Sequence, residues 1–94
     1  MFCIFTAQAE TDLESIADYI ALDNPARALS FVQEIRERCR HIAHAPRGYP
    51  LAPEYGEDIR KLPFGNYLIL YTLQADDIVI LHIPHSARDL PVHS

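Results

Sequence analysis

The sequence has few of the residues that build cofactor, metal or membrane sites. It contains three Gly, two Cys and a single Lys, and it has no apolar run near the roughly 18 residues that cross a membrane. Three scattered Gly cannot form a phosphate-binding loop, and no cationic start leads into an apolar signal segment. We therefore expect a cytoplasmic protein without a cofactor or a membrane anchor.

Candidate metal ligands are also sparse. Cys3 and Cys39 lie far apart in the sequence, at apolar positions of an expected strand and an expected helix. We interpret both as small buried hydrophobic residues in a reducing compartment. His41 and His44 stand three positions apart, without a matching set of carboxylates or thiols. The sequence therefore predicts no metal site.

Length and composition predict one globular domain over residues 1–94. Hydrophobic residues make up 49% of the chain and charged residues 22%, which is typical of a folded protein. A chain of this size buries only about 60–65% of its unfolded surface, so its core is small and a partner could stabilise it. The net charge of −5 argues against tight binding to bare nucleic acid, because that affinity comes mostly from neutralised phosphates.

Apolar spacing predicts a short strand at residues 2–5 followed by two helices. Thr6 can cap the first helix, whereas Asn24 and Pro25 begin the second, which ends before Pro46. The short connection between the helices forces an antiparallel hairpin. The apolar positions, spaced at 3.6 residues, are Ala9, Leu13, Ile16, Ala17 and Ile20 in the first helix and Ala28, Phe31, Val32, Ile35, Cys39 and Ile42 in the second.

The second helix is basic near its end, where Arg36, Arg40 and His44 follow one another at four-residue spacing. In the hairpin this end lies beside the acidic start of the first helix. We therefore expect Glu14 to pair with Arg36 or Arg40, which makes the Arg stripe a partly neutralised, solvated face. A contact with nucleic acid or a protein partner is the alternative.

A Pro-rich loop and three apolar runs form the rest of the chain. Tyr49 and Tyr55 are expected to anchor the loop at residues 46–56. The runs predict a three-stranded antiparallel meander, so the fold is α+β in the order βααβββ, with the helices on one sheet face. The runs fall at residues 58–60, 67–73 and 78–83, with turn signals at Gly65-Asn66 and Asp76-Asp77.

Both faces of this sheet are apolar, whereas a sheet with one wet face alternates apolar and polar residues. The helices can cover only one face, so the Pro-rich loop, a second copy or another chain must cover the other. In the middle strand, alternation places on one face Tyr67, Ile69, Tyr71 and Leu73, and on the other face Leu68 and Leu70. In the last strand it places on one face Ile78, Ile80 and a partly buried His82, and on the other face Val79, Leu81 and Ile83.

Arg60, His85 and Arg88 form a candidate cluster at the end of the sheet. Two guanidiniums and an imidazole could stabilise negative charge and shuttle a proton during RNA cleavage. Two other interpretations stay open. The arginines could pair with Asp58 or Asp89 and fix the sheet end, or the cluster could recognise a partner.

The order of the elements and these residues together resemble the toxins of the RelE/ParE superfamily, which are the toxic halves of bacterial type II toxin–antitoxin modules. The resemblance spans nearly the whole chain and leans to the ParE branch. It rests on Ala9-x-x-Asp12-Leu13-x-x-Ile16-x-x-Tyr19-Ile20, Asn24-Pro25-x-x-Ala28, Ile59-Arg60-x-Leu62, Gly65-x-Tyr67-x-Ile69-x-Tyr71 and Ile83-x-His85-x-x-Arg88-Asp89.

The two branches imply different targets. RelE-like members are basic, ribosome-dependent ribonucleases that use Lys and Arg side chains with a Tyr or His near the C-terminus. ParE-like members lack that set and inhibit DNA gyrase. The single Lys61, the acidic charge and the absence of a Tyr after Tyr71 favour gyrase inhibition, without a catalytic site. One alternative is an mRNA endonuclease that uses Arg60, His85 and Arg88, and another is a non-toxic remnant that only binds an antitoxin.

The resemblance also implies a cognate antitoxin, a small DNA-binding protein whose C-terminal segment wraps the toxin. Growth inhibition and plasmid stabilisation are the roles that such modules imply. We expect the antitoxin to bind the uncovered sheet face. The partner-binding residues are expected to be Leu68, Leu70, Val79, Leu81, Arg60 and Arg88.

Overall fold

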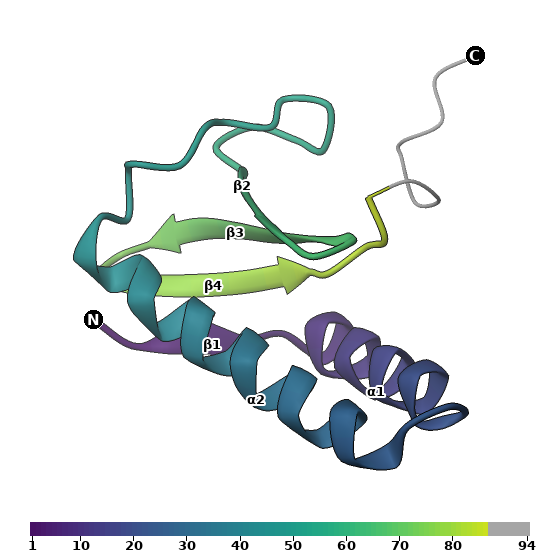
Figure 1. The fold of residues 1–94 in the computed structure, drawn as a ribbon. Helices are drawn as coiled ribbons and strands as arrows, with labels where there is room; N and C mark the ends of the chain where they lie inside the picture. Colours follow the sequence, from purple (N-terminus) through teal and green to yellow (C-terminus); the bar gives the residue numbers. More distant parts are fainter. Residues whose placement is uncertain (87–94) are drawn as a thin grey trace.

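A computed structural model describes residues 1–86 and confirms the α+β fold, with α2 crossing one face of a four-stranded sheet and α1 beside it (Figure 1). The sheet order is β1-β4-β3-β2, with β1 parallel to β4 and the other neighbours antiparallel. The predicted meander therefore forms, although its first strand is Arg60–Phe64 rather than residues 58–60. The strand at the start of the chain, β1, pairs beside the last strand, β4. The elements are β1 (Cys3–Phe5), α1 (Ala7–Ala21), α2 (Pro25–His41), a 3-10 turn (Ile42–His44), β2 (Arg60–Phe64), β3 (Tyr67–Gln74) and β4 (Asp77–His82).

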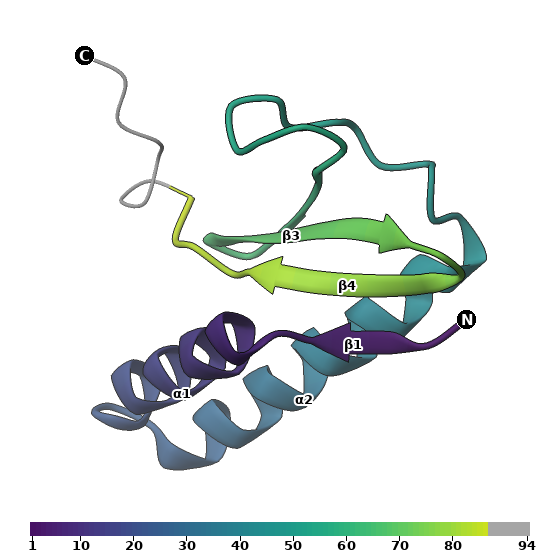
Figure 2. The ribbon, with the colours of Figure 1, turned by 180° about the vertical axis from the view of Figure 1, so that it is seen from behind.

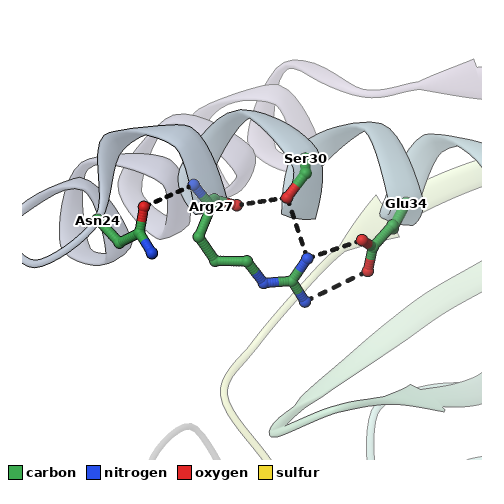
Figure 3. Close-up of polar contacts among 4 residues, drawn as sticks. All are labelled: Asn24, Arg27, Ser30 and Glu34. Carbon is green, nitrogen blue, oxygen red and sulfur yellow. Dashed lines mark hydrogen bonds and ion pairs between the residues drawn. The ribbon is translucent and has the colours of Figure 1, made fainter.

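Both helices begin at the predicted caps. The Thr6 hydroxyl accepts a hydrogen bond from the Ala9 amide at 3.1 Å and donates one to the Leu81 carbonyl at 3.0 Å, which fixes α1 against β4. The Asn24 side chain accepts from the Arg27 amide at 3.1 Å (Figure 3). Such caps satisfy backbone amides that have no partner within the helix.

The first turns of α2 carry a second network on their solvent side. Arg27 donates to Glu34 at 2.7 Å and to the Ser30 hydroxyl at 3.0 Å, and Ser30 donates back to the Arg27 carbonyl at 3.1 Å (Figure 3). The Arg27 guanidinium also lies 5.1 Å from the Phe31 ring centroid. The ion pair lowers the pKa of the Glu34 carboxyl, but it is exposed and adds little stability.

Removing the Asn24 cap is expected to destabilise the fold measurably. Asn24→Ala deletes the acceptor for the Arg27 amide and should cost about 1 kcal/mol. Calorimetry should then show a melting temperature lower by roughly 4–8 °C. Gln33→Ala, at an exposed position of the same helix, is the control and should leave the melting temperature within about 2 °C. Equal effects in the two variants would contradict the role of the cap.

The core lies between the helices and the sheet. Phe31 of α2 meets Phe64 of β2 and Tyr67 of β3, with ring centroids 5.4 and 5.9 Å apart. The predicted apolar faces of both helices supply about half of the core, and the sheet with the residue after β4 supplies the rest. The core consists of Ala9, Leu13, Ile16, Phe31, Ile35, Cys39, Ile42, Leu62, Ile69, Tyr71, Ile78, Ile80 and Ile83.

A β-bulge in β4 overturns the expected faces of its last residues. Tyr71 pairs with Ile80, but the adjacent Leu70 pairs with His82, so β4 carries one extra residue at this point. Strict alternation was expected to place Ile83 opposite Ile80. The bulge instead turns Ile83 into the core. It also pairs His82 with Leu70, so His82 does not share the sheet face of Ile80 as expected.

The expected ion pairs of Glu14 with Arg36 or Arg40 are also wrong. Arg36 donates to Glu10 at 2.8 Å, one helical turn earlier than predicted, and Arg40 pairs with Glu37 of its own helix at 2.5 Å. The stagger of the hairpin decides which acid lies opposite, and sequence spacing does not fix this stagger. The interpretation of the Arg stripe as a partly neutralised face agrees with these pairs.

The Pro-rich loop runs around the β2 end of the sheet, at the opposite end of the molecule from the helix hairpin (Figures 1 and 2). The Tyr71 hydroxyl donates to the Pro46 carbonyl at 2.6 Å, and the Tyr49 ring lies edge-on to Tyr71. Tyr49 is therefore an anchor, as predicted. Farther along, Thr72 donates its hydroxyl to the Asp58 carbonyl at 2.9 Å, which ties the loop to the sheet.

Candidate functional site

Arg60 begins β2 and fixes the loop that precedes it. Its Nη1 donates to the carbonyls of Tyr49 at 2.6 Å and Arg47 at 3.3 Å, rather than to the expected Asp58. These bonds hold the guanidinium beside the loop. There Arg60 lines a pocket of about 290 Å³ together with Asp58 and Thr72. We conclude that Arg60 anchors the loop in this structure.

His85 lies just after β4 and pairs with the start of β3. It forms a bridge with Tyr67, and its ring meets the Tyr67 ring edge-on at 5.3 Å between centroids. Together with Asp12, Ser15 and Tyr19 it lines a pocket of about 200 Å³ between α1 and the sheet end. An imidazole beside two phenols is a polar site that a partner could contact.

The structure does not bring Arg60 and His85 together. Arg60 pairs with Tyr71, whereas His85 pairs with Tyr67, four positions away along β3. At roughly 3.3 Å per residue this separates them by about 13 Å, and they line different pockets. The expectation that Arg60 and His85 lie together at one end of the sheet is therefore wrong. Because β2 runs antiparallel to β3, its first residue lies beside a later residue of β3, whereas His85 lies beside the first residue of β3. Arg88 and Asp89 lie outside the described residues.

The predicted partner-binding face divides into a covered and an open part. Leu70 is only 2% exposed, so it is a core position of this chain and the expectation that it contacts a partner is corrected. Its neighbour in β2 is Lys61, whose amide donates to the Pro50 carbonyl of the loop at 3.1 Å. Thr72 lies on the same face of β3 as Leu70, and its hydroxyl bonds to the Asp58 carbonyl, so the loop reaches this face. The loop is one of the three covers that the sequence left open.

The open part lies nearer β1, on the face that Figure 2 presents without helices. Leu68, Val79 and Leu81 are each half-buried. Val79 pairs with Ile4 of the edge strand β1, and Ile4 is 45% exposed. Paired residues on neighbouring strands share a sheet face. Ile4 therefore extends the predicted apolar surface to the edge of the sheet, which the sequence pattern did not indicate.

Asp12 and His82 form a pair that the sequence did not predict. The Asp12 carboxyl lies 2.5 Å from the His82 ring nitrogen Nδ1 and accepts the Ile83 amide at 2.8 Å. Its side chain is only 13% exposed, so the contact ties α1 to the end of β4. The two residues lie in opposite halves of the sequence, and only the parallel placement of β1 beside β4 brings them together.

Other classes of site find little support in residues 1–86. Within that range no three His, Cys, Asp or Glu side chains are grouped as a metal site would need. The described helices are also too short or too polar to cross a membrane. What remains is a small domain with an apolar strip on one sheet face and polar pockets at its ends.

Comparison with known proteins adds the family. The model of the ParE toxin of type II toxin–antitoxin systems (parDE) matches residues 3–90. A solved structure described as the chromosomal ParDE toxin–antitoxin system from P. aeruginosa is similar to this chain, with a TM-score of 0.77 and 26% identity. The similarity covers 90% of this chain and 95% of that one. No curated protein matches.

The hairpin on a four-stranded sheet and these matches define the class of protein, a toxin of the RelE/ParE superfamily. Within that class, the chain belongs to the ParE toxin family of type II toxin–antitoxin systems. The resemblance drawn from sequence fragments is thereby confirmed, including its leaning to the ParE branch.

Proposed function

We propose that this protein is a toxin that acts in the cytoplasm by inhibiting DNA gyrase and is neutralised by a cognate antitoxin. The observation that carries the proposal is the family match over nearly the whole chain. The similar solved structure is described as a ParDE toxin–antitoxin system, which supports an antitoxin partner here as well. The proposal assigns no catalytic role to any residue.

The geometry supports gyrase inhibition over the ribonuclease alternative. Arg60 holds loop carbonyls beside Tyr71 in the middle of β3, whereas His85 pairs with Tyr67 at the start of β3. They cannot act on one phosphate, because a general base must lie within hydrogen-bond reach of the proton it moves. The net charge of −5 is also unfavourable for a protein that must dock on ribosomal RNA.

Induced expression with parallel readouts tests the target. We expect filamentation and a DNA damage response, and we expect the purified protein to accumulate cleaved DNA in a reaction with gyrase and supercoiled plasmid. Co-purified antitoxin should suppress both effects. Immediate translation arrest with mRNA cleavage would support the ribosomal alternative, and unaffected growth would support a non-toxic remnant. Either result would overturn the proposal.

We further propose that an antitoxin segment covers the apolar strip formed by Ile4, Leu68, Val79 and Leu81. Burying an aliphatic side chain contributes about 1.5–3 kcal/mol, and ordering of the segment offsets part of this gain. The bonds of Arg60 to loop carbonyls make it a supporting residue in this proposal rather than a main contact.

Charge on this strip is expected to weaken the complex. Ile4→Glu places a carboxylate at the exposed edge and should lower antitoxin affinity about 10- to 100-fold in calorimetric titration. Leu22→Glu is the matched control, because Leu22 is 83% exposed at the end of α1. Circular dichroism should first show that both variants are folded. Undiminished affinity of folded Ile4→Glu would remove the strip from the interface.

A further inference from the structure

The two cysteines of the chain, Cys3 and Cys39, meet in the folded protein. Cys3 lies in the edge strand β1, and Cys39 lies in the last turn of α2, in the core. Cys3 packs against the core cluster that contains Cys39, and Arg36, one turn before Cys39 in α2, lies over the Phe5 ring of β1. Both are free, and they differ in access, because Cys3 is half-buried and Cys39 is fully buried. Two thiols on neighbouring elements that pack together are candidates for a disulfide, which needs Cα atoms about 4.4–6.8 Å apart.

Cys3 can be reached from solvent through a cavity between β1 and α2. The cavity has a volume of about 610 Å³, and its lining includes Phe2, Cys3, Glu10, Arg36 and Arg40. Arg36 is held in place by Glu10 at 2.8 Å and by the Phe5 ring, 4.9 Å from its guanidinium carbon. A small reagent that enters the cavity therefore meets one thiol beside two guanidiniums.

The surroundings give the two thiols different reactivity. The hydrogen bond from Cys39, together with the charges of Arg40 and Arg36, lowers the pKa of the Cys3 thiol against the opposing effect of burial. The hydrogen bond to Cys3 and burial raise the pKa of the Cys39 thiol. The thiolate is the reactive form, so Cys3 should attack first and Cys39 should remain protonated.

We propose that Cys3 and Cys39 form a thiol modification site that reacts with low-molecular-weight disulfides and closes into a disulfide between β1 and α2. The Cys3 thiolate attacks one sulfur of the small disulfide, and the other half leaves as a thiolate. Cys39 then loses its proton, and its sulfur attacks the Cys3 sulfur, which expels the second thiolate. The pair loses two electrons and two protons, and the small disulfide is reduced to two thiols.

The second step should be slower than the first but not blocked. The Cys3 thiolate is the main reason that Cys39 holds its proton, and this thiolate no longer exists in the mixed disulfide. Burial remains, whereas Arg36 and Arg40 favour the Cys39 thiolate. The product would close a loop of roughly 35 residues and should raise the melting temperature by about 10 °C or more.

The dianionic reagent 5,5′-dithiobis(2-nitrobenzoate) tests the proposal on the intact chain. We expect each native molecule to release two nitrothiolates in a fast and a slow phase, and to retain no adduct in mass spectrometry. Cys39→Ala should release one and keep one adduct. Cys3→Ala should react at least about tenfold more slowly than wild type. In denaturant the two thiols should react at similar rates.

Several outcomes would overturn the proposal. Two retained adducts on the native wild-type chain would show independent thiols, and no reaction before unfolding would show that the cavity gives no access. Equal rates for folded Cys3→Ala and Cys39→Ala would remove the assignment of Cys3 as the attacking thiol. The wild-type measurement needs no variant, so a variant that fails to fold leaves the test intact.

Discussion

Leu70→Asp is expected to unfold the protein rather than merely weaken its binding to a partner. Leu70 is only 2% exposed, so the new carboxylate would be buried without a partner. Burying an unpaired charge costs several kcal/mol, which is comparable to the roughly 5–15 kcal/mol that holds a small domain together. Circular dichroism and urea titration should show loss of the folded state at neutral pH.

Val79→Asp is the matched control for Leu70→Asp. Val79 lies on the same sheet face but is half-buried, so its carboxylate can reach water and the fold should survive. The two variants separate the role of the loop from that of a partner. If Leu70→Asp folds as well as Val79→Asp, the loop does not cover Leu70 in solution and the expectation of a wide open groove is restored.

Asp12→Ala is expected to give the second largest loss of stability, about 2–3 kcal/mol. The substitution removes the acceptor of the Ile83 amide and the partner of His82. A buried amide without an acceptor costs more than the net value of one hydrogen bond. Urea denaturation should show a lower midpoint with an unchanged slope, because the surface exposed on unfolding stays the same.

His82→Ala distinguishes the two contacts of Asp12. It removes the imidazole but leaves the Ile83 amide bonded to Asp12, so it should cost less than Asp12→Ala. A double-mutant cycle then gives the coupling between Asp12 and His82 directly. Asp12→Asn should recover part of the loss, because its side-chain oxygen can still accept the amide. A cost of Asp12→Ala below that of His82→Ala would place the main contribution elsewhere.

The local signals in the sequence were sufficient for most of the fold. Thr6 and Asn24 begin the helices where their side chains cap them, since capping depends only on the next three residues. Apolar periodicity likewise predicted the core faces of both helices and the alternation of β3, because burial follows the repeat of each element. The family was also accessible, because its motif fragments lie in order along the chain.

The tertiary structure decided the matters that depend on long-range placement. The parallel pairing of β1 with β4 brought Asp12 to His82 and exposed Ile4 beside Val79. One extra residue in β4 turned Ile83 inward, and a bulge leaves no reliable mark in an apolar run.

The candidate site shows the same division. Residue types pointed to Arg60 and His85, but strand direction placed them four residues apart along β3. The loop was predicted to be irregular, yet only its bonds to Thr72 and Lys61 showed where it is attached to the sheet. The sequence by itself determined the elements and the family, because these depend on local pattern. Only the tertiary structure determined which side chains meet, because each such contact joins segments whose separation along the chain carries no local signal.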